Sequence, residues 1–103
     1  MSDTVLIVGG GGREHALALA LAACPSRPQL LVAPGNPGTA QIARNVPLDA
    51  RDPDGLIEVC EREDVTCVIV GPDDPLIAGL ADRLRGAGRA VFGPGAAGAR
   101  IEG

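Results

Sequence analysis

The sequence of 103 residues contains no lysine, and all nine of its basic residues are arginine. A Walker A phosphate loop requires a lysine that reaches the β- and γ-phosphates, so this loop is excluded. An enzyme that works through a Schiff base needs a lysine amine and is excluded for the same reason.

Aromatic residues are almost absent, with one Phe and neither Trp nor Tyr. This argues against a platform on which the bases of single-stranded nucleic acid stack. The formal net charge is −4, so there is no basic field to attract nucleic acid or an anionic membrane. We therefore expect neither partner, and a core built from Val, Leu, Ile and Ala.

Cysteine pairs and histidine clusters are also missing. Cys24, Cys60 and Cys67 are irregularly spaced and there is one His, which makes a zinc site improbable. No apolar run approaches the length of a membrane span, and no charged-then-apolar leader precedes the first apolar run. We expect reduced, mostly buried thiols in a cytoplasmic protein.

Five short apolar runs alternate with helix-like segments, which favours one α/β domain over residues 1–103 with a doubly wound, parallel, five-stranded sheet. The predicted strands are 4–8, 29–33, 45–48, 66–70 and 90–92. The predicted helices are 13–23, a short one over 39–44, two that begin at Pro53 and Pro75, and a last one near Ala96. Ligands of such sheets bind beyond the carboxyl ends of the strands, which here run into Gly/Pro turns.

Four consecutive glycines at 9–12, followed by Arg13, Glu14 and His15, join the first strand to the first helix. Glycines let a ligand approach the backbone, and the N–H groups of a helix start favour an anion. A tight turn without ligand is the alternative, although four glycines exceed what a turn needs. The motif predicts a site for a phosphate-bearing small molecule.

The dinucleotide fingerprint G-x-G-x-x-G fits this loop poorly. Gly9 and Gly11 occupy its first two positions, but Glu14 stands at the third. No acidic residue lies between Glu14 and Asp49 to bind a ribose hydroxyl. NAD is therefore disfavoured, and a single phosphate of a smaller ligand fits better.

The side chains near these turns permit two readings each. Arg13 can pair with a phosphate oxygen, and Glu14 can accept from an amine or hydroxyl or simply complement the helix dipole. Asn36 offers hydrogen bonds from a loop that otherwise only feeds a helix cap. Asp74 is explained by capping, which leaves Asp73 free to face the cleft.

Four stretches, in this combination and order, resemble the amino-terminal domain of the phosphoribosylamine–glycine ligase (glycinamide ribonucleotide synthetase) family. They are Val8–Leu17 (VGGGGREHAL), Ala33–Thr39 (APGNPGT), Val70–Leu76 (VGPDDPL) and Phe92–Pro94 (FGP). The first two are specific in combination, and the resemblance runs from Thr4 to Gly103.

The resemblance implies a reaction of de novo purine biosynthesis. ATP phosphorylates the glycine carboxylate, and the amine of 5-phosphoribosylamine then displaces phosphate, which gives glycinamide ribonucleotide, ADP and phosphate. It also implies an ATP-grasp enzyme with ATP and Mg²⁺ or Mn²⁺ as cofactors. This chain would be its Rossmann-like, pre-ATP-grasp domain, which helps bind the phosphoribosyl substrate.

By resemblance, the substrate-binding residues are Gly10, Gly11, Gly12, Arg13, Glu14, Gly35, Asn36 and Asp73. Asp73 stands where the family usually has Glu, and its side chain is one methylene shorter.

Family members continue into an ATP-grasp domain, whereas this chain ends at Gly103. We expect a monomeric fragment without catalytic residues or metal ligands, which binds ligand weakly and does not catalyse ligation alone. Two alternatives stay open. One is a stand-alone nucleotide- or phosphate-binding module, and the other is the pre-ATP-grasp domain of another carboxylate–amine ligase.

Overall fold

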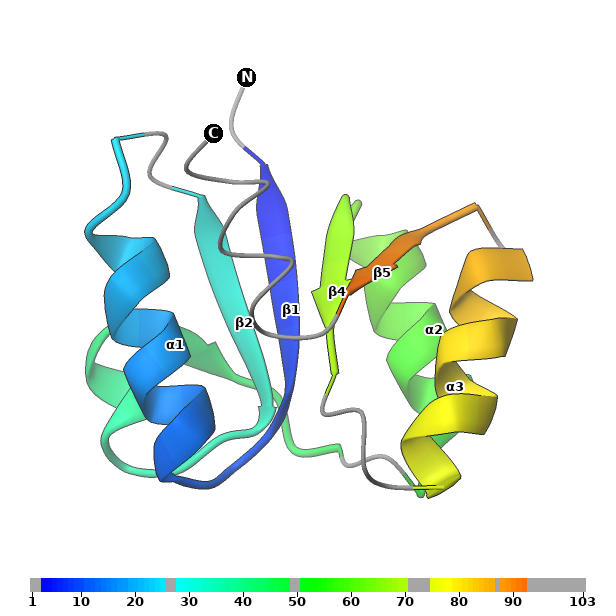
Figure 1. Cartoon of the computed structure of the whole chain (residues 1–103), viewed down its shortest axis with the longest axis horizontal. Helices are drawn as coiled ribbons and strands as arrows, with labels where there is room; N and C mark the ends of the chain where they lie inside the picture. The colour runs from blue at the N-terminus through cyan, green and yellow to red at the C-terminus, as the bar shows by residue number, and fades with distance from the viewer. Residues whose placement is uncertain (1–2, 26–27, 49–50, 71–74, 87, 93–103) are drawn as a thin grey trace.

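The computed structural model describes residues 3–25, 28–48, 51–70, 75–86 and 88–92. In chain order its elements are β1 (Thr4–Gly9), α1 (Gly12–Ala22), β2 (Gln29–Pro34), the 3₁₀ turn η1 (Thr39–Gln41), β3 (Arg44–Asn45), α2 (Pro53–Arg62), β4 (Cys67–Ile69), α3 (Pro75–Gly86) and β5 (Ala90–Phe92) (Figure 1). The five strands form one sheet in the order β3-β2-β1-β4-β5, and every pair is parallel. This confirms the predicted α/β fold and its five-stranded parallel sheet.

The central strand, β1, is buried on both of its faces. Leu6 and Val8 belong to the core under α2 and α3, whereas Val5 and Ile7 belong to the core under α1. Alternate residues of a strand face opposite sides, so a strand covered on both faces needs a continuous apolar run. The sheet is therefore wound on both faces, with α1 on one side and α2 and α3 on the other (Figure 1).

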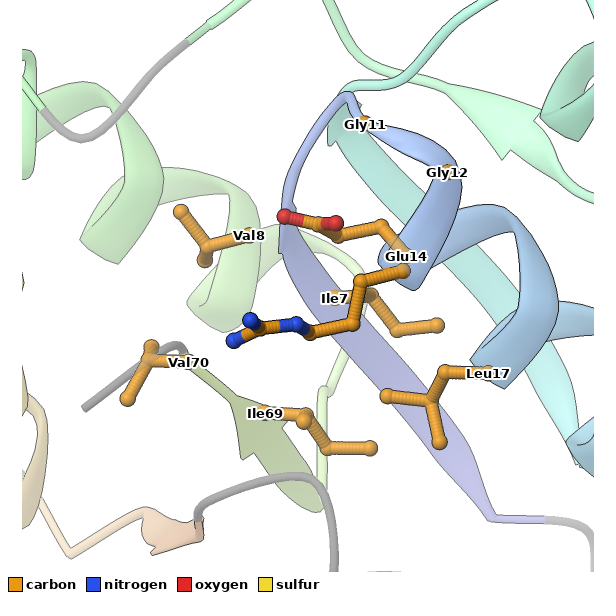
Figure 2. Close-up of a pocket in the computed structure, with 9 residues that line it drawn as sticks. Ile7, Val8, Gly11, Gly12, Glu14, Leu17, Ile69 and Val70 are labelled. Carbon is orange, nitrogen blue, oxygen red and sulfur yellow. The ribbon is translucent and has the colours of Figure 1, made fainter. Parts of the chain in front are cut away.

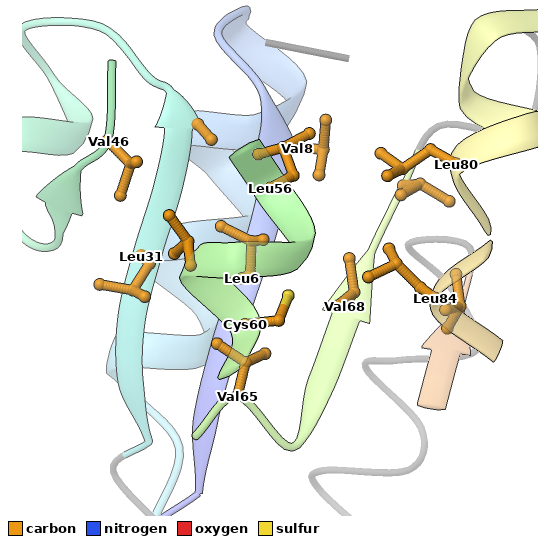
Figure 3. Close-up of a cluster of buried hydrophobic side chains, with 14 of the residues drawn as sticks. Leu6, Val8, Leu31, Val46, Leu56, Cys60, Val65, Val68, Leu80 and Leu84 are labelled. Carbon is orange, nitrogen blue, oxygen red and sulfur yellow. The ribbon is translucent and has the colours of Figure 1, made fainter. Parts of the chain in front are cut away.

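The larger core lies between the sheet and helices α2 and α3. Figure 3 shows Leu6 and Val68 of the sheet beside Leu56 and Cys60 of α2. Leu80 of α3 lies at the right of the same view. Burial raises the pKa of the Cys60 thiol, so this sulfur stays protonated and acts as a small apolar side chain. All three cysteines are buried, and none of them belongs to a disulfide.

The helices α1 and α2, whose N-cap residues are described, start differently. Asp52 caps α2, because its Oδ1 accepts a hydrogen bond of 3.1 Å from the Gly55 N–H and Pro53 takes the first helical position. The N-cap of α1 is Gly11, which has no side chain to accept from the first turn. As far as the chain is described, no side chain caps the first N–H groups of α1, which leaves them to water or a ligand.

The third strand is shorter and begins earlier than the predicted 45–48. The Val46 N–H still donates to the Val32 carbonyl at 2.8 Å, but the Leu48 N–H donates to the Val46 carbonyl at 2.7 Å. Pro47 has no N–H and cannot extend the ladder. The chain therefore turns out of the sheet immediately after β3.

The other predicted bounds lie close to those found. The helix α1 begins at Gly12, one residue before the predicted start, and the short helix over 39–44 is reduced to the turn η1. The helix expected near Ala96 falls outside the described residues. In the part of the chain that is described, no helix is both long enough and apolar enough to span a membrane.

Candidate functional site

A pocket of about 280 Å³ opens between the carboxyl ends of β1 and β4. From this point β1 leads to α1 on one face of the sheet, and β4 leads to α3 on the other. Such a reversal is the topological switch point, where open parallel sheets bind their ligands. The volume lies just under the range usual for small-molecule pockets.

One end of the pocket is apolar and the other is polar. Ile7, Leu17 and Ile69 line the apolar end, and Figure 2 shows Leu17 and Ile69 pointing toward one another. Gly11 and Gly12 line the other end, together with the side chains described below. The pocket can therefore bury one side of a small molecule while its polar group meets the start of α1.

The four glycines of the loop have different reasons to be glycine. Gly9 has φ +140°, and a Cβ there would collide with the Glu14 carboxylate, while a Cβ at Gly10 would lie 2.8 Å from the Gly35 carbonyl oxygen. A Cβ at Gly11 would meet only Glu14 Oε2 at an ordinary 3.5 Å, and one at Gly12 would meet nothing within 4 Å. The chain's own packing thus requires the first two glycines but not the last two, and the last two are those that line the pocket.

Arg13 and Glu14 also line the pocket. Arg13 is exposed and Glu14 half-buried, and neither side chain forms a hydrogen bond or ion pair with the residues that the structure describes. A guanidinium pairs well with phosphate oxygens, and a carboxylate accepts from amine or hydroxyl groups. Both are therefore available to a ligand that carries a phosphate and such a donor.

Gly35 and Asn36 contact the glycine loop from the β2 side and are not among the residues that line this pocket. The Gly35 N–H donates to the Gly9 carbonyl at 3.1 Å. Asn36 Nδ2 donates to the Gly10 carbonyl at 2.9 Å and to the Gly11 carbonyl at 3.4 Å. The structure thus brings seven of the eight predicted substrate-binding residues together around one loop, and the eighth, Asp73, lies outside the described residues.

Sequence reasoning missed the apolar wall. Leu17, Ile69 and Val70 read as ordinary core residues, and only the pairing of β4 with β1 brings the latter two to the pocket.

His15 lies against Gly38, where an added Cβ would meet its ring at 2.5 Å. Among the described residues no three His, Cys, Asp or Glu side chains cluster as metal ligands would.

Together these features define a Rossmann-like α/β domain with a small-molecule pocket at its switch point and uncapped helix N–H groups at the pocket rim. The profile of the family "Phosphoribosylglycinamide synthetase, N domain" matches residues 3–102, and the chain belongs to this family.

Curated relatives carry the name phosphoribosylamine–glycine ligase. The protein of Agrobacterium fabrum is 50% identical over 99 residues, that of Rhodopirellula baltica 50% over 99, and that of Xylella fastidiosa (strain 9a5c) 48% over 101. Each match covers 96% of this chain and 23% of the relative. The chain thus spans about a quarter of the length of these ligases.

Proposed function

We propose that this chain is the part of a phosphoribosylamine–glycine ligase that binds the phosphoribosyl substrate. One observation carries the proposal. The switch-point pocket is lined by two glycines that packing does not require and by two charged side chains without described partners. The family membership and the name shared by the relatives support the same assignment.

In this proposal the phosphate of 5-phosphoribosylamine lies at the N–H groups of Gly11, Gly12 and the first turn of α1. Arg13 pairs with a phosphate oxygen, because a charge-assisted hydrogen bond from guanidinium suits a phosphate. Glu14 accepts from a sugar hydroxyl or from the amine. The domain's contribution is to hold and orient the amine that attacks the activated glycine, which lowers the entropic cost of bringing two substrates together.

The proposal assigns ATP, glycine and the divalent cation to the remaining three quarters of the ligase. The chain has no lysine, and its described residues include no cluster of metal-binding side chains. We further propose a cytoplasmic, monomeric enzyme whose partners are small molecules, with no nucleic acid or membrane involved.

Isothermal titration calorimetry with glycinamide ribonucleotide and with NAD tests this function. The titrations use the 103-residue chain and a version extended by the sequence encoded after residue 103. We expect the ribonucleotide to bind, more tightly to the extended version, and NAD to give no heat. Tight NAD binding without a response to the ribonucleotide would identify a nucleotide-binding module instead.

A matched pair of variants locates the site. Gly12 and Gly86 are both helical glycines at which a Cβ meets nothing within 4 Å, but only Gly12 lines the pocket. Gly12→Ala should weaken binding of the ribonucleotide about tenfold, a loss of ~1.4 kcal/mol. Gly86→Ala should leave it unchanged, and equal affinities for the two variants would contradict the assignment.

A further inference from the structure

The side-chain amide of Asn36 is hydrogen-bonded at both ends within the protein. Its Nδ2 donates to the Gly10 carbonyl at 2.9 Å and to the Gly11 carbonyl at 3.4 Å, while its Oδ1 accepts from the Thr39 N–H at 2.9 Å. A side-chain amide has two N–H donors, and both are used here. Asn36 therefore has no side-chain donor left for a ligand.

The partners also fix which way the amide points. Turning it over would place Oδ1 against two carbonyl oxygens and Nδ2 against the Thr39 N–H, which would replace attractive contacts by repulsive ones. The amide nitrogen must face the glycine loop. Asn36 is thus specific for its role in a way that aspartate, of the same shape, is not.

The backbone of Asn36 is held just as firmly. Its N–H donates to Thr39 Oγ1 at 2.8 Å, and its carbonyl accepts from Asn45 Nδ2 at 2.8 Å. Thr39 is completely buried, and its hydroxyl donates to Asn45 Oδ1 at 2.7 Å. Asn36 is therefore anchored to β3 and η1, and the glycine loop is tied to this anchor.

The geometry of the peptide bond shows how the hydrogen bonds from Asn36 orient the N–H groups of the glycine loop. In a trans peptide the C=O of one residue and the N–H of the next point in opposite directions. Because Asn36 draws the carbonyl oxygens of Gly10 and Gly11 toward itself, the N–H groups of Gly11 and Gly12 point away from it. These are the two glycines that line the pocket.

We propose that Asn36 is a positioning residue, which holds the glycine loop so that its N–H groups face the pocket and does not touch the ligand itself. The inference rests on the proposed function above, since it concerns the same site. It assigns to Asn36 a structural task in ligand binding that differs from the direct contact which the resemblance implied.

Three variants of the 103-residue chain test whether the Asn36 side chain holds the glycine loop. Asn36→Asp replaces the donor by an oxygen without changing the shape, and Asn36→Ala removes the amide without adding charge. Gln41→Glu is the matched control, because it makes the same amide-to-carboxylate change at an exposed residue of η1. Backbone amide NMR shifts of Gly10–Gly12 are measured without ligand, and affinity for glycinamide ribonucleotide by calorimetry.

We expect both Asn36 variants to shift the amide signals of Gly11 and Gly12 in the ligand-free state and to bind the ribonucleotide at least tenfold more weakly. Gln41→Glu should do neither. Unchanged affinity in both Asn36 variants would overturn the inference. Weakened affinity with unshifted loop amides would also overturn it, because Asn36 would then contact the ligand directly.

Failure of the proposed function gives a different result. If the unmodified chain and its extended version do not bind the ribonucleotide, the proposed function is contradicted. The amide chemical shifts of the ligand-free variants still decide whether Asn36 holds the loop. In that case, shifted Gly11 and Gly12 amide signals in Asn36→Ala support a role of Asn36 in holding the loop, and signals like those of the unmodified chain refute it.

Discussion

Gly10 lies so close to the carbonyl oxygen of Gly35 that a Cβ on Gly10 would stand 2.8 Å from it. The adjoining Gly35 N–H donates to the Gly9 carbonyl at 3.1 Å, so the loops after β1 and β2 meet backbone to backbone. A main-chain neighbour cannot rotate aside as a flexible side chain can. Position 10 therefore accepts glycine alone without a shift of one loop.

Gly10→Ala should lower the free energy of unfolding by about 1–3 kcal/mol, the usual cost of forcing extra volume into a tight contact. Urea denaturation followed by circular dichroism measures the change. Gly12→Ala is the control, since its Cβ enters open space and should leave stability the same or slightly higher. Equal midpoints for the two variants would show that the loops can separate without cost.

Arg13→Ala should separate binding from stability. Because the Arg13 side chain is exposed and unpaired among the described residues, its loss should change the free energy of unfolding by less than about 0.5 kcal/mol. Affinity for glycinamide ribonucleotide should fall at least tenfold, as expected when a charge-assisted hydrogen bond of ~1.5–3 kcal/mol is lost. Calorimetry measures it, with Arg62→Ala on α2 removing the same charge away from the pocket. A similar loss in both variants would indicate a general charge effect.

Leu56→Ala should be among the more damaging core substitutions. Leu56 is completely buried between α2 and the sheet, and such truncations cost about 2–5 kcal/mol. Leu19→Ala is the matched control, because Leu19 on α1 is 49% exposed and its loss leaves little cavity. Denaturation midpoints should rank the unmodified chain close to Leu19→Ala and well above Leu56→Ala. The reverse order would contradict the packing of α2.

Stability should fall in acid partly through Glu63. A hydrogen bond from Arg44, with Nη2 2.8 Å from Oε2, holds the pKa of Glu63 below its ordinary value of 4.5, and Arg62 acts in the same direction. A carboxyl whose pKa is lowered by folding stabilises the fold above its unfolded pKa, and this contribution disappears as pH falls through the folded pKa. The stability difference between the unmodified chain and Glu63→Gln should thus be constant near neutral pH and shrink below about pH 4.5.

Urea titrations between pH 7 and pH 3 follow this difference. Glu58→Gln is the control, because Glu58 is 75% exposed and its contact with Arg62 is 3.7 Å long. A difference that does not change with pH for Glu63→Gln would mean that the pair with Arg44 does not form in solution.

The sheet and its helices could be predicted because their signals are local. The apolar run of β1 marks a strand buried on both faces, and the Asp52–Pro53 pair marks a helix start. The third strand was placed too late because its end depends on where Pro47 falls against β2, which is a matter of pairing.

The candidate site likewise has one part that could be predicted from local sequence and another that depends on strand pairing. The glycine loop is contiguous in sequence, so its place at the end of β1 could be predicted, while its preference for an anion stays a prediction. The apolar wall depends on β4 lying beside β1, which the order of residues does not give directly. Which glycines are packed and which are free depends on the approach of Gly35. Neither fact has a local signature.

The pairing of Ile7 with Ile69 also sets when the pocket exists during synthesis. The glycine loop leaves the ribosome early and can dock on β2, whereas its second wall is made only after β4 has emerged. Closing so long a loop costs conformational entropy, which the β1–β4 contacts must repay. A nascent chain that stops before β4 carries the whole motif yet has no pocket. Binding of a ligand to the nascent chain would therefore show that β4 has paired with β1, rather than that the glycine loop has folded.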